Sequence, residues 1–315
     1  MQIMRDILKN ILKTIKIMTN IYISIYSGYG VSLAFNIVSN SDIVGAKHTI
    51  IVKKQDSLQT IARKFDVAIT ELMLANPNID PKNIKPGTIL IIPTEFILPP
   101  GLREGIVLNL AEFRIYHFSE NQKVVNTFPV GIGRIGWQTP LGETRVVRKR
   151  EHPTWVPPPS IREHYANKGK ILPDFIPPGE DNPLGEYAMN LAWPNYLIHG
   201  TNAPNSIGLR SSSGCIRMYS EDIKALFNLT ALDTKVRVIH EPLKIGKKNN
   251  ELYLEVHESF TEKYYHDEDY TEQQLLEKII EEYYKRFKNR IDWANAFKSI
   301  KKATGYPIDI INLKN

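Results

Sequence analysis

The chain has 315 residues, of which 42% are hydrophobic and 23% are charged, and it contains one cysteine. This balance excludes a wholly disordered chain, a collagen and a coiled coil, and the length allows one or two domains with their own cores. A lone cysteine excludes an internal disulfide and a cysteine-rich zinc site. The net charge of +6 is concentrated in residues 1–34, where Arg5, Lys9, Lys13 and Lys16 face only Asp6. The remaining charge is small, so we expect no nucleic-acid partner.

The first 34 residues have the order of a secretory signal. A basic, amphipathic start is followed by apolar patches and by small residues at Ser32 and Ala34. This order predicts export with cleavage after Ala34, and an uncleaved membrane anchor is the alternative. No other segment approaches the ~20 apolar residues that a transmembrane helix needs.

Residues 47–94 predict a small β-α-α-β module. Strand-like runs at 49–52 and 88–93 flank two short helices, the first capped by Asp56 or Ser57 and the second ended by Asn76-Pro77. The segments DSLQTIARKF, NPNID and KPGTILIIP resemble those of LysM modules, although Gln55 stands where glycine is usual. The resemblance implies binding to glycans that contain N-acetylglucosamine, chiefly peptidoglycan. A structural adaptor without affinity for sugar is the alternative.

Residues 103–240 predict a mostly β domain. Short strands are expected at 105–110, 113–118, 124–130, 144–147, 187–191, 196–199 and 236–239, with a helix capped by Ser220 that runs to Asn228. Prolines fill residues 152–183, and proline cannot pair inside a sheet. We therefore expect that segment to be a long, stiff loop that lies over the sheet and covers a site.

A glycine-rich stretch at 131–136 matches the letters of a dinucleotide-binding motif. That motif needs a helix directly after it, whose N-terminus holds the pyrophosphate. Here Pro140 and Gly142 follow and exclude such a helix. The stretch is interpreted as a loop between strands, without a dinucleotide cofactor.

The tail, residues 241–315, predicts a helical extension. Thr271 to Gln274 has a capping-box pattern, and apolar residues recur at helical spacing from Leu275 to Phe297. The apolar face needs a partner in this chain or in another one.

The only cysteine lies in a stretch that suggests chemistry. Cys215 follows a run of small residues, and His199 ends an apolar strand. A thiol, an imidazole and a turn with accessible backbone amides are the groups that covalent acyl transfer requires. From residue types alone, an inert buried cysteine and a structural histidine stay open as alternatives.

The full pattern resembles the L,D-transpeptidases with a YkuD-type catalytic domain, whose motif is H-G-T…S-x-G-C-x-R/N. Here the motif reads His199-Gly200-Thr201, then Ser212-Ser213-Gly214-Cys215-Ile216-Arg217. Segments such as EGIVLNLAEFRIYHF, TPLGET and HPTWVPP resemble the subgroup typified by ErfK and YbiS, in which a LysM module precedes this domain. Many members have histidine where this chain has Ser213. The implied fold is a YkuD-type β-sandwich with a long capping loop and short helices.

The resemblance implies a role for each matched residue. Cys215 would be the nucleophile, with a lowered thiol pKa, and His199 its acid–base partner, oriented by the carbonyl of Gly200. The amides of Gly214 and Cys215, helped by Ser213, would hold the oxyanion. Candidates for substrate contact are Arg217, Ser212, Thr201, Asn202, Trp155 and Tyr187, with Trp193 as a further wall residue, although core packing is the alternative for the aromatic residues. No metal and no organic cofactor is implied.

The implied substrate is a peptidoglycan tetrapeptide stem in the periplasm. Cys215 would form a thioester at the third residue and release D-alanine. An amine would then resolve the thioester, either from another stem, giving a 3→3 cross-link, or from the lysine of the outer-membrane lipoprotein of Braun. A carbapenem would acylate the same thiol. The alternatives are an L,D-carboxypeptidase that uses water and a wall-binding scaffold without catalysis.

Overall fold

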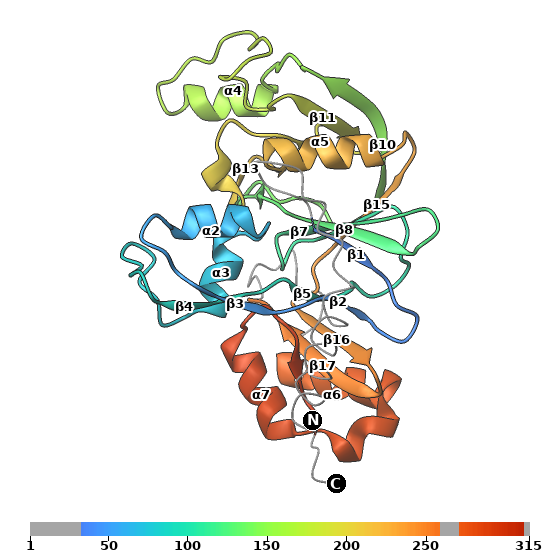
Figure 1. The fold of residues 1–315 in the computed structure, drawn as a ribbon. Coiled ribbons are helices and arrows are strands. Elements are labelled where there is room, and N and C mark those ends of the chain that lie inside the picture. Colours follow the sequence, from blue (N-terminus) through green and yellow to red (C-terminus); the bar gives the residue numbers. More distant parts are fainter. Residues whose placement is uncertain (1–32, 259–270, 312–315) are drawn as a thin grey trace, which may run out of the picture.

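The computed structural model describes residues 33–258 and 271–311 (Figure 1). The predicted secretory signal therefore lies outside the described residues, except for Leu33 and Ala34. These two residues begin β1 (Leu33–Asn36), which pairs with β8 (Val124–Pro129), so cleavage after Ala34 would divide that strand. Within the described ranges, no helix has both the length and the apolar character to cross a membrane.

The predicted β-α-α-β module is confirmed. Strand β3 (His48–Ile51) pairs with β4 (Ile89–Ile92), and α2 (Leu58–Lys64) and α3 (Ile69–Ala75) lie between them in the chain. Ser57 caps α2, because its Oγ accepts the Thr60 amide at 3.1 Å while the Thr60 hydroxyl accepts the Ser57 amide at 2.8 Å. The module has its own core, formed by apolar side chains of α2, α3 and β4.

A nine-stranded sheet forms the centre of the molecule. Its order is β1-β8-β7-β6-β15-β10-β11-β12-β14. The strands not yet given are β6 (Ile106–Asn109), β7 (Arg114–Phe118), β10 (Gly142–Glu151), β11 (Tyr187–Leu191), β12 (Leu197–His199), β14 (Ile216–Arg217) and β15 (Lys235–Ile239). Two short strands, β9 (Ile132–Gly133) and β13 (Arg210–Ser212), form a separate pair. The strands from β8 to β14 in this order share one core with α5 (Ser220–Leu229). The strands predicted for residues 103–240 are confirmed.

The proline-rich segment contains a helix that the sequence analysis did not predict. Helix α4 (Pro159–Ala166) begins with proline at its first position, where the missing N–H costs nothing and the fixed φ suits a helix. Trp155 and Ile176 pair through both backbone groups and close the segment on itself. A second difference concerns α5, because Tyr219 is its N-cap and Ser220 is already helical.

The C-terminal extension contains strands as well as helices. The capping box at Thr271 begins α6 (Glu272–Tyr283) as predicted, and η3 (Lys285–Arg290) and α7 (Trp293–Lys302) follow. They pack on a three-stranded sheet of β16 (Leu243–Lys248), β17 (Glu251–Val256) and β18 (Ile308–Asp309). The extension therefore contains the predicted helices together with a small sheet that the sequence analysis did not predict. The remaining strands, β2 (Ile43–Gly45) and β5 (Glu95–Ile97), pair beside this sheet (Figure 1).

Candidate active site

Strand pairing places His199 and Cys215 on one face of the sheet. Strand β12 runs parallel to β14, with Ile198 opposite Ile216 and His199 opposite Arg217. Ile198 and Ile216 belong to the core. Because side chains alternate along a strand, His199 and Arg217 turn to the other face. Cys215 directly precedes β14, and its thiol lies beside the Leu197 amide of β12 and the charge of Arg217. The thiol and the imidazole, 16 residues apart in the chain, therefore share a surface.

The ring of His199 is oriented by a hydrogen bond to the backbone of the next residue, Gly200. Its Nδ1 lies 2.5 Å from the carbonyl oxygen of Gly200, and the residue is only 4% exposed. A carbonyl accepts, so Nδ1 carries the proton and Nε2 is the basic nitrogen of the neutral ring. Burial, together with the positive charge of Arg217, lowers the pKa of His199 to about 4. The imidazole is neutral at physiological pH and can act as a general base.

The thiol of Cys215 is half-buried, and its Sγ lies 3.5 Å from the carbonyl oxygen of Asn195. Burial raises the pKa of the Cys215 thiol to about 11, although the backbone amide of Leu197 and the charge of Arg217 act in the opposite direction. The expectation of a lowered thiol pKa is therefore wrong. The pair consists of a neutral thiol and a neutral imidazole, so the proton has to move as the sulfur attacks.

The turn before Cys215 is built on side-chain hydrogen bonds. Ser212 Oγ accepts the Gly214 amide at 3.2 Å and donates to the Cys215 carbonyl at 2.5 Å. Thr139 Oγ1 donates to the Gly214 carbonyl at 2.8 Å. Gly214 has φ +101°, and a Cβ there would lie 2.9 Å from the Tyr196 ring, so glycine is required. Ser212 shapes the turn, and the Gly214 amide is engaged within it.

Two residues that the sequence analysis missed lie on the same face. In the β10–β11 register Arg150 stands opposite Ala188, which in turn stands opposite His199. Asn190, two residues after Ala188, shares that face. Among the described residues, Arg150 Nε, Arg217 Nε and Asn190 Oδ1 are buried without a hydrogen-bond partner. Three of the seven such side-chain atoms in the described residues therefore belong to the face that carries the histidine. The alternation along β10 was the signal that could have revealed Arg150.

Arg134 links this turn to the proline-rich segment. Its Nη1 donates to Ser213 Oγ at 3.0 Å, and its Nη2 lies 3.3 Å from His164 Nε2 on α4. The guanidinium also lies over the Trp137 ring at 4.9 Å. The segment with α4, at the top of Figure 1, is therefore connected to the loop that carries Cys215, in agreement with the predicted covering loop.

The other predicted contact residues lie elsewhere. Tyr187 neighbours Ala188 in β11, so it faces the core, where its ring lies 5.0 Å from that of Phe227. Trp193 also packs against the core. Trp155 pairs with Ile176 inside the proline-rich segment. Asn202 donates to the Asp181 carbonyl at 3.1 Å, and Thr201 lines a separate cavity.

One cluster in the described ranges has the residue types of a metal site, formed by Glu112, Glu255 and His257. The ammonium of Lys244 lies 2.9 Å from both carboxylates, and His257 Nε2 lies 2.7 Å from Glu255. The ammonium of Lys244 therefore supplies the positive charge that a bound metal ion would supply in this position. The cluster is an ion-pair network of the molecular interior, separate from His199 and Cys215.

Comparison with known proteins identifies the families of the two domains. Residues 103–238 match the L,D-transpeptidase catalytic domain of the YkuD family, and residues 50–93 match the LysM domain. The chain is 42% identical over 231 residues to the probable L,D-transpeptidase YcfS of Escherichia coli, covering 71% of this chain and 72% of that protein. It is 42% identical over 222 residues to the probable L,D-transpeptidase ErfK/SrfK of the same organism, covering 69% and 71% of the two chains.

Proposed function

This chain is a member of the L,D-transpeptidase family, and from that premise we propose that Cys215 is its nucleophile and a peptidoglycan tetrapeptide stem its acyl donor. The observation that carries the proposal is that Arg217 stands opposite His199 in the register of β12 and β14, while the thiol of Cys215 lies beside Arg217 and the Leu197 amide of β12. The LysM domain and the catalytic domain together imply peptidoglycan as the ligand.

The proposed first step forms a thioester. Cys215 Sγ attacks the carbonyl at the L-centre of the third stem residue while His199 Nε2 takes the thiol proton. The tetrahedral intermediate then collapses, the C–N bond to D-alanine breaks, and His199 returns the proton to the leaving amine. Because the Gly214 amide is bound to Ser212 Oγ, we propose the Cys215 amide as the first oxyanion donor.

The proposed second step transfers the acyl group. An acceptor amine attacks the thioester, His199 removes a proton from that amine, and the proton returns to the departing sulfur. We propose two acceptors, the third residue of another stem, which gives a 3→3 cross-link, and the lysine of a Braun-type lipoprotein. Both require an extracytoplasmic location, for which we propose the periplasm. A carbapenem would acylate Cys215 in the same way as the donor stem.

Charge on the site face supports a carboxylate-bearing donor. Arg150 and Arg217 lie there with buried nitrogens that have no partner in the described chain. A peptide stem carries free carboxylates, and guanidinium groups pair with carboxylates in fixed geometry. We therefore propose that these two arginines orient the donor before attack.

The test uses purified sacculi and mass spectrometry of the muropeptides. Wild type is expected to produce 3→3 dimers or lipoprotein-linked stems, and Cys215→Ala is expected to produce neither. His199→Ala should lose at least ~100-fold in rate, the usual scale of general-base catalysis. His48→Ala, which alters an exposed histidine, is the matched control and should keep full activity.

Each contrary outcome has a distinct meaning. If Cys215-dependent products are only trimmed tripeptides, the chain is a carboxypeptidase that uses water. If Cys215→Ala retains wild-type transfer, the assignment of the nucleophile is overturned.

A further inference from the structure

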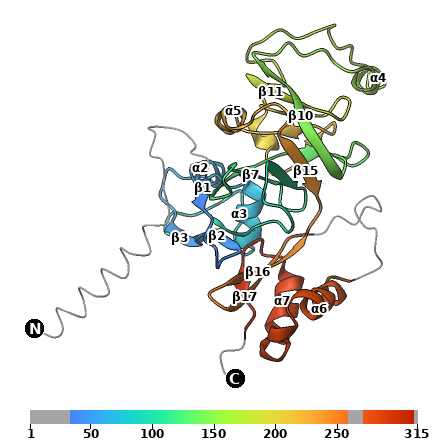
Figure 2. The same ribbon diagram turned by 90° about the vertical axis from the view of Figure 1, so that its right-hand side faces the viewer.

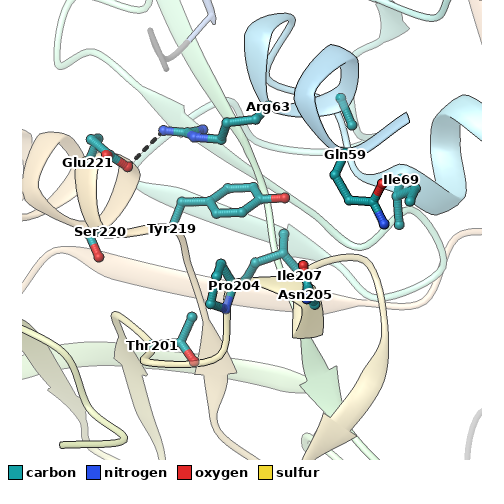
Figure 3. Close-up of a pocket in the computed structure, with 11 residues that line it drawn as sticks. Gln59, Arg63, Ile69, Thr201, Pro204, Asn205, Ile207, Tyr219, Ser220 and Glu221 are labelled. Atoms are coloured by element: carbon teal, nitrogen blue, oxygen red, sulfur yellow. Dashed lines mark hydrogen bonds and ion pairs between the residues drawn. The ribbon is translucent and has the colours of Figure 1, made fainter. Parts of the chain in front are cut away.

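A buried charge cluster joins the LysM module to the catalytic domain. Asp66, which follows α2, and Asp222, on α5, both have fully buried side chains. One guanidinium contacts both carboxyl groups, because Arg63 Nη1 lies 3.4 Å from Asp66 and Arg63 Nη2 lies 3.2 Å from Asp222. Figure 3 shows Arg63 beside a cavity between the two domains, where it also reaches Glu221 at 2.9 Å.

A second buried guanidinium lies beside Asp66, but another carboxylate already pairs with it. Arg114 Nε and Nη2 donate to the two carboxylate oxygens of Glu71 at 2.9 and 2.7 Å. The same Nη2 donates to the backbone carbonyl of Asp66 at 3.2 Å, so it leaves the Asp66 carboxyl group without this cation as a direct partner. The cluster therefore sets three buried carboxyl groups, those of Asp66, Asp222 and Glu71, against two guanidinium groups.

The cluster lacks one positive charge, and the deficit falls on Asp66. Its one ion pair among the described residues is the contact of 3.4 Å to Arg63. Burial raises the pKa of both Asp66 and Asp222 above the usual range of carboxyl groups. The other groups nearby do not correct the imbalance, because burial raises the pKa of Tyr219 to about 12, so its phenol is neutral, and Glu221 adds negative charge. A buried carboxylate without a full partner is costly.

The backbone nitrogen of Leu33 lies where this charge is missing. Leu33 begins β1, and its N–H donates to Asp66 Oδ2 at 3.2 Å. In the uncut chain this nitrogen belongs to a neutral amide. If Leu33 were the first residue of the chain, the same nitrogen would be an α-ammonium in contact with a buried carboxylate.

The sequence before Leu33 has the form of a leader cleavage site. Gly30 and Ser32 place small residues at the third and the first position before the bond to Leu33, which is the pattern that leader cleavage sites share. Strand β1 begins directly after this bond, so cleavage here leaves the strand whole. Cleavage after Ala34 would instead remove two residues that pair with β8.

We propose that a leader peptidase hydrolyses the bond between Ser32 and Leu33, and that the α-ammonium of Leu33 then pairs with Asp66. Water adds across the peptide bond, so Ser32 leaves with a carboxylate and Leu33 keeps the nitrogen, which is protonated at neutral pH. The new charge balances the three buried carboxyl groups and ties β1 to the LysM module. The inference rests on the extracytoplasmic location proposed above, because leader peptidases act on exported chains.

The first experiment expresses the full chain with its leader in a bacterial host and measures the intact mass and N-terminal sequence of the exported protein. The product should begin at Leu33. A product that keeps the leader, or that begins at any other residue, overturns the inference.

The second experiment measures the pKa of the α-amine in the exported protein from the pH profile of its acetylation. A synthetic peptide of residues 33–40 is the reference, and its α-amine should titrate at about 7.7–8.0. Contact with Asp66 should move the profile of the protein upward by about one pH unit or more, the usual effect of an opposite charge in contact. A profile equal to that of the peptide overturns the pairing.

Two variants assign the effect to Asp66. Asp66→Asn keeps the size of the side chain and removes its charge, so the α-amine should titrate like the peptide. The matched control, Asp80→Asn, makes the same change at an exposed position of the LysM module and should keep the raised profile. Equal profiles in the two variants would show that Asp66 does not hold the amine. If Asp66→Asn does not fold, the comparison of wild type with the peptide still decides.

Neither readout involves Cys215. Leader removal and the titration of the α-amine can therefore fail while Cys215-dependent transfer succeeds, and the reverse outcome is equally distinct.

Discussion

Arg217 acts on both members of the proposed catalytic pair, His199 and Cys215. Its positive charge lowers the pKa of His199 and also lowers that of Cys215, while burial of the thiol outweighs the second effect. With a neutral imidazole and a neutral thiol, the proposed mechanism requires proton transfer during attack. This differs from a preformed ion pair, and two measurements distinguish the two states.

The first measurement is the acid limb of kcat/KM for a tetrapeptide donor. With the pKa of His199 at about 4, the base stays unprotonated down to that pH, and activity should fall only near it. Arg217→Met removes a charge that lowers this pKa. The imidazole then protonates at higher pH, so the acid limb should move upward.

The control for this shift is Arg145→Met, which alters an exposed arginine paired with Asp233. It should leave the acid limb in place. An unchanged limb in Arg217→Met would contradict the electrostatic role of Arg217.

The second measurement is alkylation of Cys215 by iodoacetamide at pH 7. A pKa raised from 9.0 to about 11 leaves about 100-fold less thiolate, and the greater nucleophilicity of a more basic sulfur offsets about tenfold of that loss. The thiol should therefore react about tenfold more slowly than a simple peptide cysteine. Because Cys215 is the only cysteine, the label reports on it alone. Alkylation faster than the peptide would indicate an activated ion pair instead.

At the scale of elements, Arg134 connects α4 to the turn that precedes Cys215. None of the residues of α4 is buried, so it lacks an apolar anchor of its own. Arg134 joins His164 on this helix to Ser213, which lies two residues before Cys215. Figure 2 shows α4 at the outer edge of the molecule.

Arg134→Met should loosen α4. Loss of the hydrogen bond to His164, worth about 1 kcal/mol, should speed amide exchange in residues 159–166 by about fivefold. Exchange measured by mass spectrometry tests this, with Arg145→Met as the arginine control. Equal exchange of α4 in the two variants would show that other contacts hold the helix.

At the scale of the whole molecule, Lys244 ties three parts of the chain together. From β16 its Nζ pairs with Glu112 beside β7 and with Glu255 of β17, and it donates to the Ile97 carbonyl of β5 at 2.5 Å. The side chain is 1% exposed. The C-terminal sheet, formed by β16, β17 and β18, is therefore joined to the rest of the molecule through a buried charge. Figure 2 shows this sheet below the nine-stranded sheet.

Lys244→Met should lower the free energy of unfolding by about 3–5 kcal/mol, because it leaves buried carboxylates without their cation. Urea denaturation measures this change. Lys247→Met, on the same strand but half-buried, should cost about 0.5 kcal/mol or less. Adding Glu112→Gln and Glu255→Gln to Lys244→Met should recover part of the loss. A cost equal to that of Lys247→Met would show that the network contributes little.

Local sequence patterns were sufficient for much of this architecture. Helical spacing and caps predicted the β-α-α-β module, and the motif around His199 and Cys215 pointed to the site. Strand-like patterns predicted the strands of the nine-stranded sheet except the two at its ends, β1 and β14. The hairpin of β16 and β17 was missed, although Asn249 and Asn250 adopt positive φ in its turn and such a pair is a recognised hairpin signal. Helix α4 was missed because its prolines suggested a loop.

The sequence by itself determined the residue types of the reaction and the order of the domains. Only the tertiary structure decided that the thiol is protonated, that Arg150 and Asn190 face His199, that Tyr187 faces the core, and that Thr201 lines an interdomain cavity. Burial and the register between strands distant in the chain decide these properties, and neither is encoded by the spacing of residues within one segment.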